Sequence, residues 1–125
     1  MYTLILLIVL TVAVILYYVF MYFRQKKILK TLSEEEFKAG YRKAQLIDVR
    51  EPNEFANGHI LGARNIPLTQ LKARLKEIRP DKPVYLYCQS GSRSGRAAQL
   101  LHKNGCKDLS HLEGGFKKWG GKIKA

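Results

Sequence analysis

The stretch Pro83-Val84-Tyr85-Leu86-Tyr87-Cys88-Gln89-Ser90-Gly91-Ser92-Arg93 decides the fold of this chain. Its first half is a short apolar run of β-branched and aromatic residues between a proline and a polar cluster, which predicts a buried strand. Residues 94–104 carry apolar side chains at helical spacing and precede Gly105, so they predict a helix that ends at a glycine. Cys88 is therefore expected at the carboxyl end of a strand, in a tight turn that opens a helix.

This position favours a reactive thiolate at Cys88. The first turn of a helix presents unpaired N–H groups and a partial positive charge, and a tight turn adds further N–H groups that hold an anion. Arg93 adds a full positive charge at the end of the loop. Because the thiolate is the nucleophilic form, Cys88 is the predicted nucleophile. The alternative is a structural cysteine that packs as a small hydrophobe, but such a residue needs neither a polar loop nor an arginine.

The amino-terminal part of the chain predicts a transmembrane helix over residues 2–23. These residues carry no charge, and at about 1.5 Å per residue they reach roughly 33 Å, enough for a hydrocarbon core of about 30 Å. Tyrosines near both ends suit the two membrane interfaces. A cleaved signal peptide is the alternative. It is disfavoured by the length of the run, the lack of basic residues before it and the lack of a small-residue cleavage site after it.

Positive charge follows the predicted span in a basic juxtamembrane linker, residues 24–30, which contains Arg24, Lys26, Lys27 and Lys30. The positive-inside rule then places the amino terminus outside the cell membrane and the remainder in the cytoplasm. The net charge of +12 lies wholly after residue 23 and suits a surface that faces an anionic membrane. Nucleic acid is not a predicted partner, because the lysines form no basic stripe interleaved with aromatic residues.

The chain has two cysteines, Cys88 and Cys106, and three histidines, His59, His102 and His111. Two cysteines make no disulfide framework, and the histidines show no ligand spacing with them, so a zinc site is not predicted. No other metal and no organic cofactor is predicted either. Cys106 is expected in the core, with a resolving cysteine for Cys88 as the alternative. His102 and His111 have no recognisable partner.

Strands alternate with helices beyond residue 30, which predicts an α/β domain with a mainly parallel sheet flanked by helices. A Ser33–Glu36 capping box starts the first helix of this domain. Residues 58–63 are expected as loop and residues 120–125 as a frayed tail. The predicted strands are 31–32, 46–49, 64–66, 84–87 and 107–112, and the predicted helices are 34–40, 52–55, 68–79, 94–104 and 116–119. Ligands bind at the carboxyl ends of such strands, which is where Cys88 is expected.

Four motifs, residues 48–51, 58–67, 88–93 and 112–119, together resemble a single-domain rhodanese over roughly residues 31–121. The resemblance implies a rhodanese-like sulfurtransferase, whose loop cysteine takes sulfane sulfur from a donor such as thiosulfate or a persulfide. The resulting persulfide then passes the sulfur to cyanide or to a thiol, and a protein is one possible acceptor. The resemblance implies that Cys88 is the nucleophile and that Arg93 holds a small anionic donor. It implies that the persulfide is cradled by the loop residues Gln89, Ser90, Gly91 and Ser92.

Other residues are expected to support the site. Asp48 is expected to accept hydrogen bonds from loop N–H groups and Arg50 to pair with Glu54 or Glu51, while His59 holds its loop through hydrogen bonds. Two alternative functions stay open. Phosphatases and arsenate reductases of related fold have five residues between cysteine and arginine, whereas here four separate Cys88 from Arg93. A non-catalytic rhodanese-fold binding module at the membrane would need neither residue.

Overall fold

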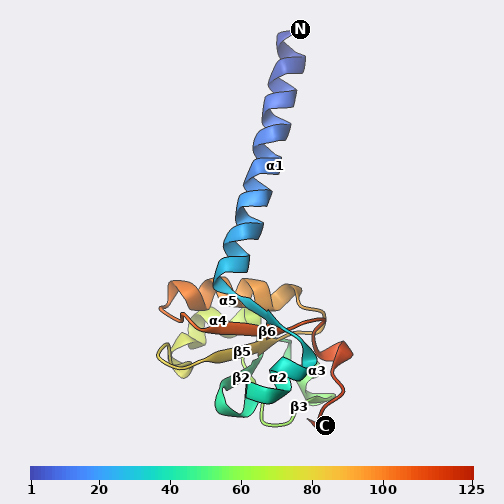
Figure 1. The fold of residues 1–125 in the computed structure, drawn as a ribbon, viewed down its shortest axis with the longest axis vertical. Coiled ribbons are helices and arrows are strands. Elements are labelled where there is room, and N and C mark those ends of the chain that lie inside the picture. The colour runs from blue at the N-terminus through green and yellow to red at the C-terminus, as the bar shows by residue number, and fades with distance from the viewer.

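The computed structural model gives the backbone of residues 1–125 and describes the side chains of residues 1–24 and 28–125. The chain consists of one long helix, α1 (Tyr2–Ile28), and a small α/β domain that begins at β1 (Lys30–Leu32) (Figure 1). The helix continues past the apolar run, so most of the stretch expected as a linker is helical. The side chains of Lys26 and Lys27, which entered the orientation argument, lie outside the described residues.

The domain is built on a five-stranded sheet in the order β1-β6-β5-β2-β4. Every neighbouring pair in it is parallel, which confirms the predicted sheet. The remaining strands of this sheet are β2 (Gln45–Asp48), β4 (Arg64–Asn65), β5 (Val84–Tyr87) and β6 (Leu109–Leu112). With β5 at its centre, the carboxyl end of β5 lies between those of β6 and β2.

Helices cover both faces of the sheet (Figure 1). On one face lie α4 (Leu68–Leu71), a 3₁₀ segment (Lys72–Glu77) and α5 (Ser92–Lys103), and α1 also contacts α5. On the other lie α2 (Glu34–Gly40) and a 3₁₀ turn (Tyr41–Lys43). The short helix α3 (Pro52–Ala56) follows β2, and a last 3₁₀ turn spans Phe116–Lys118. The Ser33 capping box is confirmed, because Ser33 Oγ accepts the Glu36 N–H at 3.2 Å.

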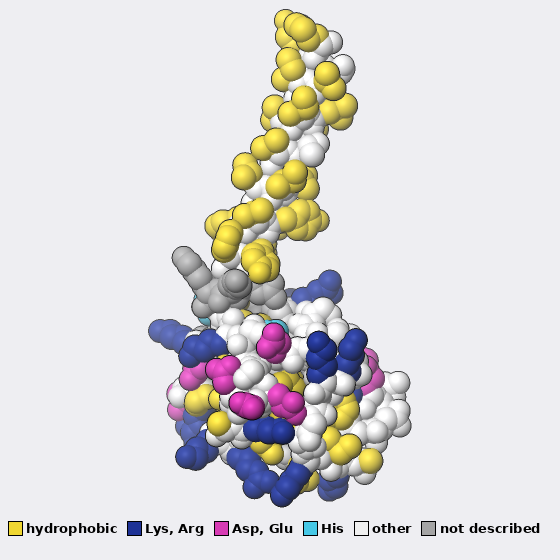
Figure 2. All heavy atoms as spheres, turned by 45° about the vertical axis from the view of Figure 1, so that its right-hand side comes forward, with side chains coloured by type: hydrophobic (Ala, Val, Ile, Leu, Met, Phe, Trp, Pro, Cys, Tyr) yellow, Lys and Arg dark blue, Asp and Glu magenta, His cyan; other side chains and the backbone are white. Residues whose placement is uncertain are grey.

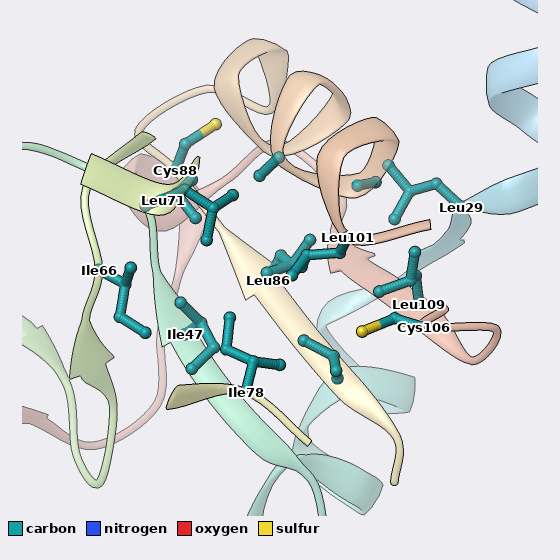
Figure 3. Packing of buried hydrophobic residues seen from close by; sticks show 14 residues of the cluster. Leu29, Ile47, Ile66, Leu71, Ile78, Leu86, Cys88, Leu101, Cys106 and Leu109 are labelled. Atoms are coloured by element: carbon teal, nitrogen blue, oxygen red, sulfur yellow. The ribbon is translucent and has the colours of Figure 1, made fainter. Parts of the chain in front are cut away.

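Side chains along β5 alternate between two cores. Val84 and Leu86 join a cluster on the α4/α5 face, whereas Tyr85 and Tyr87 join a second cluster against α2. This period of two is what a strand buried on both faces requires. The next residue, Cys88, continues the alternation and lies in the α4/α5 cluster (Figure 3). The strand thereby directs the sulfur toward α5.

Two expected elements differ from the structure. The predicted helix 68–79 is α-helical only to Leu71, and a 3₁₀ segment follows in which Arg74 has non-helical angles (φ −115°, ψ 19°). Apolar residues three apart fit a 3₁₀ helix as well as an α-helix. The tail is also not frayed: β7 (Ile123–Lys124) pairs with β3 (His59–Ile60), inside the stretch expected as loop. This pairing satisfies backbone groups that both segments would otherwise leave unpaired.

Candidate active site

Cys88 stands between the end of β5 and the start of α5, as predicted. Its side chain is fully buried, and its Sγ accepts a hydrogen bond from the Gly91 N–H over 2.9 Å. Gly91 has φ +110° and precedes the first residue of α5. This left-handed conformation suits glycine because a Cβ would be strained there. The turn at Gly91 therefore folds the loop back over the sulfur.

The loop residues predicted as a cradle divide into two groups. Gln89 and Gly91 are half-buried, whereas Ser90 and Ser92 are exposed. Helix α5 begins at Ser92, two residues earlier than predicted. Ser92 and Arg93 therefore belong to its first turn, where backbone N–H groups have no partner within the helix. The Gly91 N–H, directly before this turn, is the backbone donor that the structure places on the sulfur.

Arg93 lies at the rim of the loop and pairs with Glu54 of α3. Its two terminal nitrogens donate to Glu54 Oε1 and Oε2 at 2.7 Å and 3.0 Å. The hydrogen bonds from Arg93 outweigh partial burial and lower the pKa of Glu54 to about 2, and the same pair raises the pKa of Arg93. The predicted pairing of Arg50 with Glu54 or Glu51 is therefore wrong.

Arg50 instead pairs with Asp48, which lies nearest to it at the end of β2. Both are buried, at 2% and 0% exposed, and Arg50 Nη2 donates to Asp48 Oδ2 at 2.7 Å. Burial alone would lower the pKa of Arg50, but the hydrogen bonds and negative charge of Asp48 outweigh it and raise that pKa overall. The Arg50 N–H donates to Asp48 Oδ1 at 2.9 Å. Asp48 therefore accepts a loop N–H group, as predicted.

The Arg50 guanidinium also connects the active loop to its surroundings. It donates to Gln89 Oε1 at 3.1 Å and to the Gly58 carbonyl at 2.7 Å, and it lies 4.2 Å from the centre of the Phe116 ring. A planar group with five donors suits this connection of several segments. Arg50 and Asp48 thus position the loop from inside the domain and do not reach the sulfur.

A glycine turn supports the loop from the other side. The Phe116 N–H donates to the Cys88 carbonyl at 2.8 Å, and the Lys117 N–H donates to the Gln89 carbonyl at 3.2 Å. Gly115 has φ +72°, and a Cβ there would lie 2.6 Å from the Cys88 carbonyl oxygen. Only glycine allows this approach of the two backbones.

The histidines near the site play different parts. His59 forms a hydrogen bond through Nδ1 to the Phe55 carbonyl at 3.0 Å and stacks on the Phe55 ring, which confirms that it holds its loop. His111 had no recognisable partner in the sequence. In the structure its Nδ1 lies 2.7 Å from Ser94 Oγ, and its Nε2 lies 2.9 Å from Thr31 Oγ1. The alternation of side chains along β6 could have predicted that His111 lies on the α5 face of the sheet. It could not have predicted that the ring lies beside these two hydroxyls.

Cys106 is a core residue, as expected. It is fully buried in the α4/α5 cluster, and burial raises the pKa of its thiol. Figure 3 shows Cys88 and Cys106 at opposite ends of this cluster, which does not favour Cys106 as a resolving partner. Among the side chains that the structure describes, no three His, Cys, Asp or Glu residues gather as a metal site requires.

The fold and the loop around Cys88 define the class of this protein. Residues 33–122 match the Rhodanese-like domain family, and the chain belongs to this family. It is 73% identical over 113 residues to the uncharacterized protein YqhL of Bacillus subtilis, covering 90% of each chain. It is 37% identical to the thiosulfate sulfurtransferase GlpE of Shewanella oneidensis, over 62% of this chain and 77% of that one.

The solved structures agree with this assignment. A rhodanese-related protein from Thermoplasma volcanium superimposes with a TM-score of 0.70 at 28% identity, over 76% of this chain and 97% of that one. The likeness covers the α/β domain, so the predicted fold class is confirmed. The chain carries in addition one amino-terminal helix long and apolar enough to cross a membrane.

Proposed function

We propose that this chain is a membrane-anchored sulfurtransferase in which Cys88 carries sulfur as a persulfide. The observation that carries the proposal is the Cys88 sulfur itself, held under the Gly91 N–H at the start of α5. An N–H donor at a helix start stabilises negative charge on sulfur, which both a thiolate and a persulfide anion bear. The sequence similarity to a thiosulfate sulfurtransferase supports the same chemistry.

The reaction proceeds in two displacements. The Cys88 thiolate attacks the outer sulfur of thiosulfate, a new S–S bond forms, and sulfite leaves with the electron pair of the old S–S bond. Cyanide or a thiolate then attacks the outer sulfur of the persulfide, so that thiocyanate or a new persulfide leaves and the Cys88 thiolate returns. Such a covalent intermediate divides one difficult transfer into two easier steps. The loop of Gln89, Ser90, Gly91 and Ser92 surrounds the transferred sulfur.

Arg93 has a defined part in this scheme. Its guanidinium is already bound by the Glu54 carboxylate, with side chains about a third exposed (31% and 30%). A dianionic donor that approaches the rim competes with Glu54 for the same donors, because guanidinium binds such oxyanions in the same bidentate way. Arg93 thus binds the donor at the entrance, while the loop N–H groups bind the reacting sulfur.

The other functions are less well supported. A phosphatase or arsenate reductase needs a loop that surrounds a tetrahedral oxyanion, and this loop is one residue shorter than theirs. A binding module without catalysis has no use for a nucleophilic cysteine beside Arg93. Both alternatives are separated from sulfur transfer by the experiment below.

The anchor completes the proposed function. The most apolar 18-residue stretch within Tyr2–Arg24 of helix α1 has a mean hydropathy of 2.9, and none of that stretch is buried inside the structure. We assign residues 2–23 to a single membrane span, residues 24–30 to the basic segment at the membrane surface and residues 31–121 to the catalytic domain. The positive charge after the span supports a cytoplasmic location for this domain, where thiols for the second displacement are abundant.

Intact-mass spectrometry of the full chain in a mild detergent, after incubation with thiosulfate, tests the sulfur transfer. We expect a gain of one sulfur atom that cyanide removes. The gain should vanish in Cys88→Ser and persist in Cys106→Ser, the matched control, since both thiols are buried in one cluster. A sulfur gain in Cys88→Ser, or none in the folded wild type with thiosulfate and persulfide donors, would refute the proposal.

A further inference from the structure

Four side chains form a continuous line of short contacts from the buried sulfur to the edge of the sheet. Cys88 Sγ lies 3.8 Å from Ser94 Oγ, which lies 2.7 Å from His111 Nδ1, and His111 Nε2 lies 2.9 Å from Thr31 Oγ1. Cys88 and Ser94 are fully buried, His111 is half-buried and Thr31 is exposed. The line therefore leads from the interior to solvent.

The fold brings these residues together from three elements and from the loop after β5, which holds Cys88. Ser94 lies in the first turn of α5, His111 in β6 and Thr31 in the neighbouring edge strand β1. Thr31 and His111 are register partners in the β1–β6 pair, so their side chains lie on the same face of the sheet. Leu109, two residues before His111, packs in the α4/α5 cluster, which identifies this face as the one toward α5.

The hydrogen bonds of Ser94 allow a proton to pass. Its hydroxyl lies 2.8 Å from the Gly91 carbonyl as well as 2.7 Å from His111 Nδ1. One hydroxyl proton serves one of these acceptors at a time. When it points to Gly91, the imidazole donates through Nδ1; when it points to Nδ1, the imidazole donates through Nε2 to Thr31. In the second arrangement Ser94 Oγ is free to accept the thiol proton.

We propose that His111 is the base that accepts the proton of Cys88 through Ser94. The S–H bond breaks as its proton moves to Ser94 Oγ, while the Ser94 proton moves to His111 Nδ1. This leaves a thiolate and an imidazolium, with Nε2–H donating to Thr31. The inference deepens the proposed function, on which it rests, by naming how its nucleophile is generated. Ser94 contacts the reacting thiol and His111 acts on it through Ser94, while neither touches the transferred sulfur.

The surroundings of His111 agree with this role. β5 contributes apolar Leu86 in register with it, α5 the Ser94 hydroxyl, β1 the Thr31 hydroxyl, and the charged group that acts on the ring is Glu113. Burial lowers the pKa of His111, and the negative charge of Glu113 opposes this only in part. The resting imidazole is therefore neutral at neutral pH and able to accept a proton.

The test measures alkylation of Cys88 by iodoacetamide as a function of pH. The full chain in detergent carries Cys106→Ser, so that Cys88 is its only thiol. We compare two variants. In His111→Gln the glutamine can still form hydrogen bonds with Ser94 but does not take up a proton. His102→Gln is the control, because His102 is an exposed histidine of α5. At neutral pH we expect His111→Gln to react roughly 100-fold more slowly, the lower range of positioned proton transfer, and His102→Gln to react as the parent does.

The pH profile separates proton transfer from a structural effect. The deficit of His111→Gln should disappear at alkaline pH, where hydroxide removes the thiol proton directly. Ser94→Ala should show the same deficit, and the double variant no larger one, because both residues serve one path. A parental rate and pH profile in His111→Gln, or a deficit equal at every pH, overturns the proposal.

The same samples distinguish this proposal from the proposed function. Sulfur uptake from thiosulfate and from a persulfide donor is measured in parallel by intact mass. If the parent chain takes up no sulfur but its alkylation depends on His111, sulfur transfer fails and the proton path stands. If sulfur is taken up and alkylation is independent of His111, the proton path fails and sulfur transfer stands.

Discussion

At the scale of single residues, the site contains two arginines with opposite surroundings. Arg50 is sealed inside the domain by Asp48, whereas Arg93 meets Glu54 at a rim that solvent reaches. A buried pair loses several kcal/mol when one partner is removed, because the other charge stays uncompensated. An exposed pair is worth about 1 kcal/mol or less. Only the pair at the rim can therefore open for an anionic donor at little cost.

The Glu54–Arg93 pair predicts a specific pH dependence of stability. Arg93 lowers the pKa of Glu54 from 4.5 to about 2, so the stabilising contribution is complete above about pH 4.5 and is lost as the pH falls toward 2. We expect Glu54→Gln to lower the free energy of unfolding by about 1 kcal/mol at neutral pH, with a smaller difference in acid. Urea unfolding followed by the fluorescence of Trp119, the single tryptophan, measures it.

A double-mutant cycle isolates this contribution. Glu54 also accepts the Glu51 N–H at 3.0 Å and so caps α3, which a glutamine can still do. Comparing Glu54→Gln, Arg93→Gln and the double variant removes such separate effects. A coupling that is zero at neutral pH, or that stays constant as the pH falls below 4, would contradict the assignment.

At the scale of elements, the active loop is held by a neighbouring turn. The turn after β6 approaches the loop so closely that Gly115 has no room for a Cβ beside the Cys88 and Gln89 carbonyls. The Cβ that Gly115→Ala adds therefore displaces the loop. Alanine is in addition strained at the positive φ of this position. We expect it to slow persulfide formation by about 100-fold, as misplacement of reacting groups by about 1 Å does, and to lower stability by about 2 kcal/mol.

Gly62 provides the matched control for this prediction. It has φ +92°, but a Cβ there would meet nothing within 4 Å. Gly62→Ala should therefore pay only the backbone strain of roughly 1 kcal/mol and form the persulfide at the rate of the parent. Intact-mass time courses with thiosulfate give both rates. Equal rates for Gly115→Ala and Gly62→Ala would show that the close approach does not position the loop.

The secondary-structure elements also show how much of the fold and of the site can be predicted from the sequence. The strand before Cys88, the helix after it and the parallel sheet follow from local patterns of apolar residues, and all are found. The pairing of His59–Ile60 with Ile123–Lys124 joins segments far apart in the chain and leaves no local signal. The same holds for the pair of Glu54 with Arg93 and for the contacts of His111. Tertiary neighbours of polar residues are thus what the sequence does not reveal.

At the scale of the whole molecule, an apolar helix and a charged domain meet at one face. Figure 2 shows hydrophobic side chains along the helix and mixed charge over the domain. In Figure 1 the helix leaves the domain beside α5. A fully exposed apolar helix is costly in water, at about 25 cal/mol for each Å² of apolar surface. A lipid bilayer removes this cost, and α4 and α5 would then face the membrane.

The arrangement predicts how the chain sits in a cell. We expect the full chain to stay in the membrane fraction after alkaline carbonate washing, which removes peripheral proteins. With a carboxy-terminal tag, proteinase K added to intact spheroplasts should leave the tag in place and should remove it only after lysis. If charge sets the proposed orientation, adding four lysines before Tyr2 should reverse a fraction of the molecules by weakening the asymmetry.

These outcomes separate an anchor from other uses of the same helix. A cleaved signal sequence would release a domain without residues 2–23 into the soluble fraction, and amino-terminal sequencing of the purified protein would show it. Digestion of the tag in intact spheroplasts would place the domain outside, away from the thiols of the cytoplasm. In that case the sulfur acceptor would have to be an external nucleophile, because the persulfide at Cys88 can transfer only to a group on its own side of the membrane.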